Sequence, residues 1–244
     1  MSHFFRFPHT PHIAWLQSGS PRDDKVLTPD EIEQLLSGPV VVEEKLDGAN
    51  LGFSITSEGH LRAQNRGAYL HAPYTGQFSR LEQWITQHED RFFDAIGEEL
   101  ILFGEWCAAR HSLDYQCLPD WWLLFDVYDR NEQRFWSTTR RNALAERLQL
   151  ATVPALLQQQ VTVDSLKTLV ATQDSRYRSG PLEGVVIRRQ DENWLIARGK
   201  LVRAEFTQAI ESHWRNRAIE WNRVDFSIAD GAIADEDSSN KNSD

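Results

Sequence analysis

This chain has few cysteines, no long apolar run and no surplus of positive charge. Cys107 and Cys117 are the two cysteines among 244 residues, and such a small number indicates reduced thiols rather than a disulfide framework. The apolar runs are too short to span a membrane, and residues 1–16 lack the layout of a signal peptide. The histidines and cysteines lack zinc-site spacing. We therefore expect a cytoplasmic protein without a membrane segment, disulfide or zinc site.

Acidic residues outnumber basic ones, which argues against adhesion to nucleic acid by bulk charge. The chain has 36 Asp and Glu against 26 Lys and Arg, a net charge of −10, although this total still allows a local basic groove. Residues 230–244 hold five acidic residues and one lysine, which account for −4 of the total. We predict a disordered acidic tail over 229–244 that follows one domain over 1–228.

Hydrophobic patterning predicts a single α+β domain. A helix is expected after Thr28, which can cap it, with Pro29 in its first turn and Glu31 completing a capping box. This order of elements fits mixed or antiparallel sheets with helices outside. The remaining predicted elements are a strand at 40–45, a hairpin of 51–57 with 61–64, a helix at 78–95, strands at 100–106 and 121–128, helices at 137–150 and 163–172, a strand pair at 183–189 and 193–198, and an aromatic-rich helix at 204–221.

Charged residues recur where the predicted strands end. A charge at the end of a buried strand is costly unless another group pairs with it or a ligand uses it. The segments with this property are KLDG at 45–48, NRG at 65–67, FGEW at 103–106, FDVYD at 125–129, EGVVIR at 183–188 and RGKLVR at 198–203.

These segments, in this order, resemble the motifs of the covalent nucleotidyltransferases, which are ATP-dependent ligases and capping enzymes. KLDG resembles the nucleophile motif of that family, EGVVIR its fourth motif, and Arg198 with Lys200 its fifth. Residues 104–129 are closer still to bacterial and phage RNA ligases. The resemblance covers residues 40–210. It implies the ATP-grasp-like adenylation domain of those ligases, with ATP and Mg²⁺ or Mn²⁺ as cofactors.

The resemblance also implies a reaction of three steps. Lys45 forms a phosphoramidate with AMP, AMP passes to a 5′-phosphate end of RNA, and a 3′-hydroxyl end then attacks, which seals the strand. RNA repair is the expected use of this activity. Asn50 matches an asparagine that RNA ligases of this type use in end joining. Asp47 stands where some RNA ligases carry histidine and matches DNA ligases, so the choice between RNA and DNA stays open.

The chemistry of these residue types agrees with the resemblance. A lysine attacks the α-phosphate of ATP only as a free amine, and we expect neighbouring cations and Mg²⁺ to lower its pKa. Mg²⁺ prefers oxygen ligands and keeps several waters, so a few carboxylates suffice. The candidate residues are Lys45, Lys200 and Glu183 for catalysis; Glu44, Asp47, Asn50, Arg66, Glu105, Phe125 and Arg198 for the nucleotide; Glu183 and Glu105 for the metal; and Arg188, Arg203 and His111 for RNA.

Each of these residues also has an ordinary structural interpretation. Taken alone, Lys45 would be a surface lysine after an edge strand, and Glu105 and Glu183 would be strand-end carboxylates. Phe125 lies in the apolar stretch WWLLFDVY and would belong to a core, and Arg203 would lie on a solvated face. The combination of all the segments favours the functional interpretation.

The length of the chain bears on the donor and on partners. Only 44 residues follow Lys200 and 39 precede the first predicted strand, which are too few for an OB fold or for the extra domain of NAD-dependent ligases. We therefore expect ATP as the donor and RNA ends such as a nick in a duplex as the substrate, and either a minimal ligase or one whose clamp a partner protein supplies. The alternatives are a DNA ligase or capping enzyme, and a non-catalytic module that binds a nucleotide or RNA end.

Overall fold

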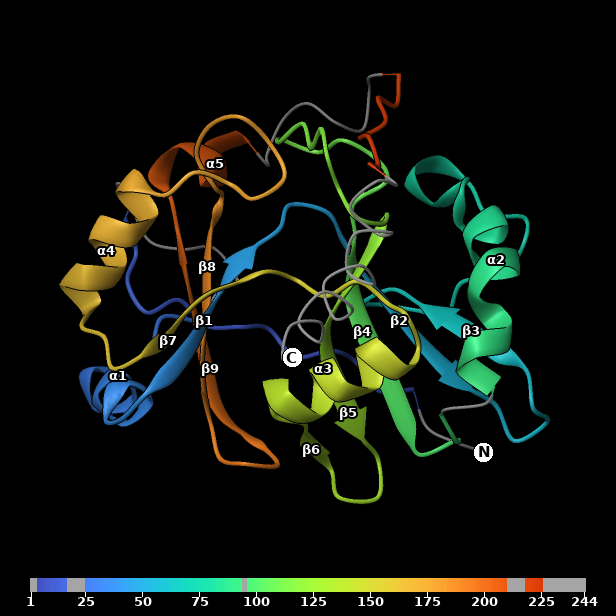
Figure 1. Cartoon of the computed structure of the whole chain (residues 1–244), viewed down its shortest axis with the longest axis horizontal. Coiled ribbons are helices and arrows are strands. Elements are labelled where there is room, and N and C mark those ends of the chain that lie inside the picture. The colour runs from blue at the N-terminus through green and yellow to red at the C-terminus, as the bar shows by residue number, and fades with distance from the viewer. Residues whose placement is uncertain (1–3, 17–24, 94–95, 210–217, 226–244) are drawn as a thin grey trace, which may run out of the picture.

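The computed structural model describes residues 4–16, 25–93, 96–209 and 218–225, in which helices are interspersed among strands (Figure 1). The elements in order are α1 (Pro29–Leu36), β1 (Val40–Lys45), β2 (Ala49–Ile55), β3 (Leu61–Gln64), the 3-10 helix η1 (Gly76–Phe78), α2 (Leu81–Phe93), β4 (Leu100–Trp106), β5 (Trp122–Asp129), β6 (Arg134–Phe135), α3 (Thr138–Arg147), β7 (Ala155–Gln159), α4 (Val163–Thr172), β8 (Gly184–Gln190), β9 (Leu195–Val202) and α5 (Ala204–Ala209).

Two antiparallel sheets form the scaffold. The first has the strand order β7-β1-β8-β9 and the second β3-β2-β4-β5-β6. In Figure 1, α1 and α4 flank the first sheet on the left, and α2 flanks the second sheet on the right. The predicted α+β class is confirmed, and every pair of neighbouring strands is antiparallel.

Helices α1, α3 and α4 begin at residues whose side chains cap them, and the cap of α1 is the predicted one. Thr28 accepts a hydrogen bond from the backbone N–H of Glu31, and the Glu31 carboxylate accepts one from the Thr28 N–H, so α1 has the predicted capping box. Ser137 and Thr162 cap α3 and α4. Within the described ranges, no helix combines the length and apolarity that crossing a membrane requires.

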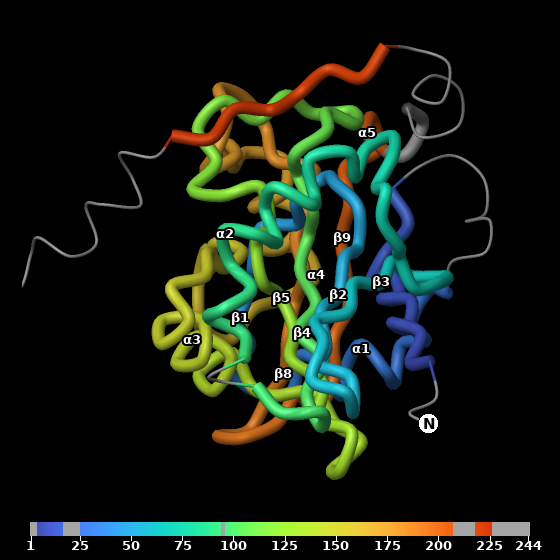
Figure 2. The backbone as a smooth tube through the Cα atoms, turned by 90° about the vertical axis from the view of Figure 1, so that its right-hand side faces the viewer, coloured from blue at the N-terminus to red at the C-terminus, as the bar shows by residue number. Residues whose placement is uncertain are grey.

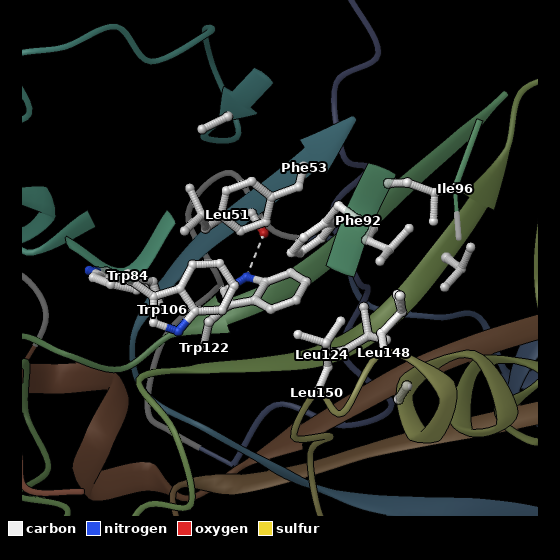
Figure 3. Packing of buried hydrophobic residues seen from close by; sticks show 14 of the residues in the cluster. Leu51, Phe53, Trp84, Phe92, Ile96, Trp106, Trp122, Leu124, Leu148 and Leu150 are labelled. Atoms are coloured by element: carbon white, nitrogen blue, oxygen red, sulfur yellow. Dashed lines mark hydrogen bonds between the residues drawn. The ribbon is translucent and has the colours of Figure 1, made fainter. Parts of the chain in front are cut away.

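An aromatic core lies between the second sheet and helices α2 and α3 (Figure 3). Trp84 of α2 stacks on Phe53 of β2 with 5.2 Å between ring centroids, and Trp122 of β5 packs edge-on against the same ring. The indole N–H of Trp122 donates to the Leu51 carbonyl at 3.0 Å, so a buried tryptophan keeps its polar atom satisfied. This packing holds the strands of the second sheet in place by one face, and the opposite face of the same strands carries polar residues.

The N-terminal segment, residues 4–16, contacts both sheets. Phe5 stacks on Tyr128 of β5 with 3.7 Å between ring centroids. The N–H of Ile13 donates to the carbonyl of Lys200 in β9, and the N–H of Lys200 donates to the carbonyl of Pro11, each at 2.8 Å. The segment thus joins the second sheet to the edge strand of the first.

Two strands and one helix differ from the prediction. β6 has two residues, and β7, with the sequence ALLQQ, lies at a sheet edge without strict alternation. The described part of the helix predicted at 204–221 includes α5, whereas residues 218–221 are not helical, because residues 218–225 lie along the loop between β4 and β5 (Figure 2). There the N–H of Asn222 donates to the Ala108 carbonyl at 2.9 Å. Trp214 and the predicted acidic tail lie outside the described residues.

Candidate active site

A pocket of about 490 Å³ lies between the two sheets, which is within the size range of small-molecule sites. Residues of β1, β8 and β9 line one side, residues of β2, β4 and β5 the other, and the N-terminal segment borders it. Asp47, His111 and Arg203 lie outside the lining. The predicted site residues that line the pocket are Glu44, Lys45, Asn50, Arg66, Glu105, Phe125, Glu183, Arg188, Arg198 and Lys200.

Lys45 ends β1, and its ammonium group lies against Glu183, the residue before β8. Nζ of Lys45 is 2.7 Å from each carboxylate oxygen of Glu183. Burial acts to lower the pKa of Lys45, but the carboxylates of Glu183, Glu105 and Asp47 outweigh it, so the pKa is raised above 10.5. The neighbouring cations alone do not lower this pKa in this arrangement, in which carboxylates dominate the surroundings of the lysine, and the expected effect of Mg²⁺ stays a prediction.

Glu105 of β4 and Asn50 of β2 are direct neighbours across the second sheet. Oε1 of Glu105 accepts a hydrogen bond from the Gly48 N–H at 3.0 Å, and burial raises the pKa of Glu105 to about 7. Both polar atoms of the Asn50 side chain are buried without a hydrogen-bond partner. Such atoms are costly unless a further group satisfies them, so Asn50 offers a donor and an acceptor to a ligand in the pocket.

The residues present fit a nucleotide with a divalent ion. Phe125, Asn50 and Arg66 all line the pocket, and the Asn50 amide and Nε of Arg66 are buried without a hydrogen-bond partner. Glu183 and Glu105 supply oxygen donors, which suffice for an ion that keeps waters and also binds phosphates. Among the described residues, no group of three or more His, Cys, Asp or Glu side chains could hold a metal.

Glu44 is held at the pocket by the segment before β8. Its Oε2 accepts a hydrogen bond from the backbone N–H of Arg176 at 2.9 Å. Burial raises the pKa of Glu44 above 4.5, although the hydrogen bonds from Ser175 and Arg176 oppose the shift. The carboxylate is therefore fixed in position, and its contact with adenine stays a prediction.

Asp47 anchors a loop instead of facing the pocket. Its Oδ2 accepts hydrogen bonds from the backbone N–H groups of Ser112 and Leu113 at 2.7 and 2.9 Å. Its own N–H donates to the Tyr115 hydroxyl at 2.8 Å. This internal role differs from the nucleotide contact that the sequence suggested, because the carboxylate already accepts two backbone hydrogen bonds.

His111 and Arg203 are also held by contacts within the protein. Nε2 of His111 lies 2.7 Å from Oε1 of Gln77, and burial lowers the pKa of His111. Nη1 of Arg203 donates to the carbonyls of Val170 and Ala171 at 3.0 and 3.2 Å, at the end of α4. A contact of either residue with RNA stays a prediction.

Asp126 of β5 lies between two arginines of the first sheet. Arg188 of β8 and Arg198 of β9 are direct partners across the strands, and Nη2 of Arg188 is 2.5 Å from Oδ1 of Asp126. Arg198 pairs with the other oxygen of the same carboxylate, and its guanidinium lies 4.4 Å from the centroid of the Phe7 ring. Arg188 is 1% exposed, so an internal ion pair replaces the contact with RNA that was predicted for it.

The N-terminal segment contributes pocket residues that the sequence analysis missed. Phe7, His9, Thr10 and His12 all line the pocket. Nδ1 of His9 lies 3.2 Å from Nη1 of Arg66. The available signal was the cluster of three phenylalanines in FFRFPH, which is too short to distinguish a packed segment from a loop.

Several solved structures share this fold. An RNA ligase of Naegleria gruberi, solved with PPi, has a TM-score of 0.59 and 19% identity over 84% of this chain and 63% of that one. An archaeal ATP-dependent RNA ligase has a TM-score of 0.56 and 22% identity over 81% and 48%. A putative ATP-dependent DNA ligase from Aquifex aeolicus has a TM-score of 0.52 and 22% identity over 82% and 50%. This chain thus spans less than two thirds of each of these proteins.

Sequence comparison adds the family. No curated protein matches the sequence significantly. The family model for RNA ligase matches residues 38–203, which is more than half of the chain and includes Lys45, Glu183 and Lys200. The chain therefore belongs to the RNA ligase family.

Proposed function

We propose that this chain is an ATP-dependent RNA ligase that joins a 5′-phosphate end to a 3′-hydroxyl end through a lysyl-AMP intermediate. The observation that carries the proposal is the position of Lys45, at the end of a strand and in a pocket that Glu105, Glu183 and Lys200 also line. Membership of the RNA ligase family supports it. Variants of the Naegleria gruberi ligase that were solved with ATP and Mn share the fold.

The first step is the attack of Lys45 on ATP. A bond forms between Nζ and the α-phosphorus, the bond to the β-phosphate bridging oxygen breaks, and pyrophosphate leaves. Nζ must first leave its ion pair with Glu183 and release a proton to solvent, because an ammonium group has no free electron pair. Arg66 and Lys200 would stabilise the phosphate charge. A divalent ion held by Glu183 and Glu105 would supply further positive charge at the phosphates.

The second and third steps use RNA ends. The 5′-phosphate oxygen attacks the phosphorus of lysyl-AMP, which breaks the P–N bond and leaves AMP on the RNA. The 3′-hydroxyl then attacks the 5′-phosphorus, and AMP departs as the phosphodiester forms. We assign Asn50 to this joining step, since its unpartnered amide can bind a phosphate or hydroxyl group. The proposal includes RNA repair in the cytoplasm and a partner that grips the RNA.

Intact-mass measurement tests the first step. The purified chain is treated with pyrophosphate and Mg²⁺ to remove any bound AMP, and is then incubated with ATP or GTP. We expect a gain of one AMP that is labile in acid, requires ATP and is absent from Lys45→Ala. No gain in mass would contradict the ligase activity and favour a module that binds a nucleotide reversibly.

Sealing assays then test the substrate. Matched nicked duplexes with RNA or DNA ends are compared at several salt concentrations, because phosphate contacts weaken as salt rises. We expect RNA ends to be joined faster. Preference for DNA would fit a DNA ligase. That alternative is suggested by Asp47, which matches DNA ligases at a position where some RNA ligases carry histidine.

A further inference from the structure

A β-bulge in β5 places two consecutive residues in the pocket. Leu124 and Val127 belong to the same core on the outer face of the sheet although they are three residues apart, whereas a regular strand repeats every two residues. The register explains this, because successive residues of β4 pair with Leu124 and Asp126 and leave Phe125 without a partner. Phe125 and Asp126 therefore both line the pocket.

Two arginine side chains hold the carbonyl of the bulged residue. Nη1 of Arg141, in α3, donates to the Phe125 carbonyl at 2.8 Å, and Nη1 of Arg188 donates to it at 3.4 Å. Arg141 is 1% exposed. Its Nε and Nη2 donate to Oδ1 of Asn142 at 3.0 and 2.7 Å. The planar guanidinium group thus fixes the backbone of Phe125 from outside the strand.

The same arginine also reaches the strand that carries the lysine. Nη2 of Arg141 lies 2.7 Å from Oε1 of Glu43 in β1, and the carboxylate of Glu43 is 2% exposed. Glu43 directly precedes Glu44 and lies two residues before Lys45. Arg141 therefore links the Phe125 backbone in the second sheet to Glu43 of β1 in the first sheet, and both of these residues line the pocket.

We propose that Arg141 is a positioning residue for base recognition, which holds the Phe125 ring against the base of the nucleotide. This inference rests on the proposed function and adds to it a residue whose guanidinium group holds the backbone carbonyl of Phe125. A bulged residue lacks a ladder partner to set its orientation, so the contacts of its carbonyl help to set where the ring points, together with the edge-on packing of the ring against Phe7 at 5.3 Å between centroids. A role restricted to stability would instead affect every ligand of the pocket equally.

A double-mutant cycle of Arg141 and Phe125 tests this inference. The rate of AMP adduct formation is measured against ATP concentration for wild type, Arg141→Met, Phe125→Ala and the double variant. Removing a base-stacking ring costs about tenfold in affinity. We expect each single variant to raise the half-saturating ATP concentration about tenfold with the maximal rate kept within about twofold, and the double variant to equal Phe125→Ala.

A ligand without a base supplies the second readout. Inorganic tripolyphosphate competes for the phosphate end of the pocket, and we expect its inhibition constant to be unchanged in Arg141→Met. Arg140→Met is the matched control on the same helix, since Arg140 packs on Trp136 and Trp194 instead of reaching the pocket. The inference is overturned if Arg141→Met responds to ATP as wild type does, or if the effects of the two variants add in the cycle. It is also overturned if Arg141→Met weakens tripolyphosphate binding as much as ATP binding.

Two further measurements keep the test decisive. If Arg141→Met does not fold, Asn142→Ala replaces it, because this change removes the acceptor of two guanidinium N–H groups of Arg141. We expect Asn142→Ala to raise the half-saturating ATP concentration about threefold, and to have no further effect when Phe125→Ala is also present. If wild type forms no adduct, the proposed ligase activity fails, and the same cycle is measured by equilibrium ATP binding. An adduct in wild type with no effect of either variant overturns the role of Arg141 alone.

Discussion

Arg188 and Arg198 lie directly opposite one another on β8 and β9, and the carboxylate of Asp126 from the other sheet lies between them. Like charges that face each other across neighbouring strands repel. Asp126 pairs with both of them and joins the two sheets at the same point, and a second buried carboxylate, that of Glu43, lies 3.7 Å from Nε of Arg188. The geometry between the sheets therefore depends on buried carboxylates, of which Asp126 is the one that contacts both arginines.

Replacing this carboxylate should destabilise the fold. We expect Asp126→Asn to lower the free energy of unfolding by roughly 3 to 5 kcal/mol, because breaking a buried ion pair from one side leaves uncompensated charge. Urea denaturation at neutral pH measures the change. Lys167→Gln is the control, since it removes an exposed pair with Asp164 and is expected to cost less than about 1 kcal/mol. Equal stability of Asp126→Asn and wild type would contradict this account.

Asn50 and Asn222 should separate function from stability. Asn222 is buried, accepts the Tyr115 N–H at 2.9 Å and donates to the Cys107 carbonyl at 2.8 Å. We expect Asn222→Ala to lower the free energy of unfolding by about 1 to 3 kcal/mol. Asn50→Ala removes an amide without partners and is expected to stay within about 1 kcal/mol of wild type.

The activity assays should show the reverse order for these two variants. Asn50→Ala is expected to form the AMP adduct on Lys45 but to join RNA ends slowly, and Asn222→Ala to join them at a rate near that of wild type while it remains folded. Adduct formation is followed by mass and joining by gel electrophoresis of labelled RNA. A large loss of stability in Asn50→Ala would show that its amide has partners within the protein.

The sequence predicted those parts of the fold that local periodicity determines. Leu81, Trp84 and Phe92 lie at helical spacing, and all three are buried against the second sheet as α2 requires. Val40 and Val42 alternate toward the core of the first sheet, and a strand was predicted there. The segments with charged residues at predicted strand ends include most of the residues that line the pocket, because these segments lie in the space between the two sheets.

Features that depend on tertiary contacts were beyond the sequence. The bulge at Phe125 adds one residue at the end of the apolar run 121–125, and periodicity cannot detect an added residue where the preceding positions are all apolar. Asp47 is held by a loop some 65 residues away along the chain, so its motif alone could not reveal that role. The pKa of Lys45 depends on carboxylates whose distances are set by the packing of the sheets.

Glu44 should make stability depend on pH. Burial raises the pKa of Glu44 above 4.5, so the folded chain binds more protons at this site than the unfolded chain. Its contribution is therefore most favourable below pH 4.5 and is lost as pH rises through the raised pKa. We expect the stability of wild type relative to Glu44→Gln to fall as pH rises, in urea denaturation with EDTA present.

An exposed glutamate provides a control of opposite sign. A hydrogen bond from Ser57 lowers the pKa of Glu58 below 4.5, so its contribution is present above that pH and is lost as pH falls. The stability of wild type relative to Glu58→Gln should accordingly fall toward acid pH. A difference between wild type and Glu44→Gln that does not change with pH would show that the buried carboxyl titrates as in the unfolded chain.

Gly48 should tolerate no side chain. A Cβ atom there would lie 2.5 Å from the Trp106 carbonyl oxygen and 3.0 Å from Cγ of Glu105, and Trp106 is fully buried. We expect Gly48→Ala to lower the free energy of unfolding by roughly 1 to 3 kcal/mol and to slow adduct formation, because β2 must move away from Glu105. Gly38→Ala is the control, since nothing lies within 4 Å of a Cβ at that position. Denaturation and the intact-mass assay measure both effects, and wild-type behaviour of Gly48→Ala would show that β2 and β4 are not held this close together.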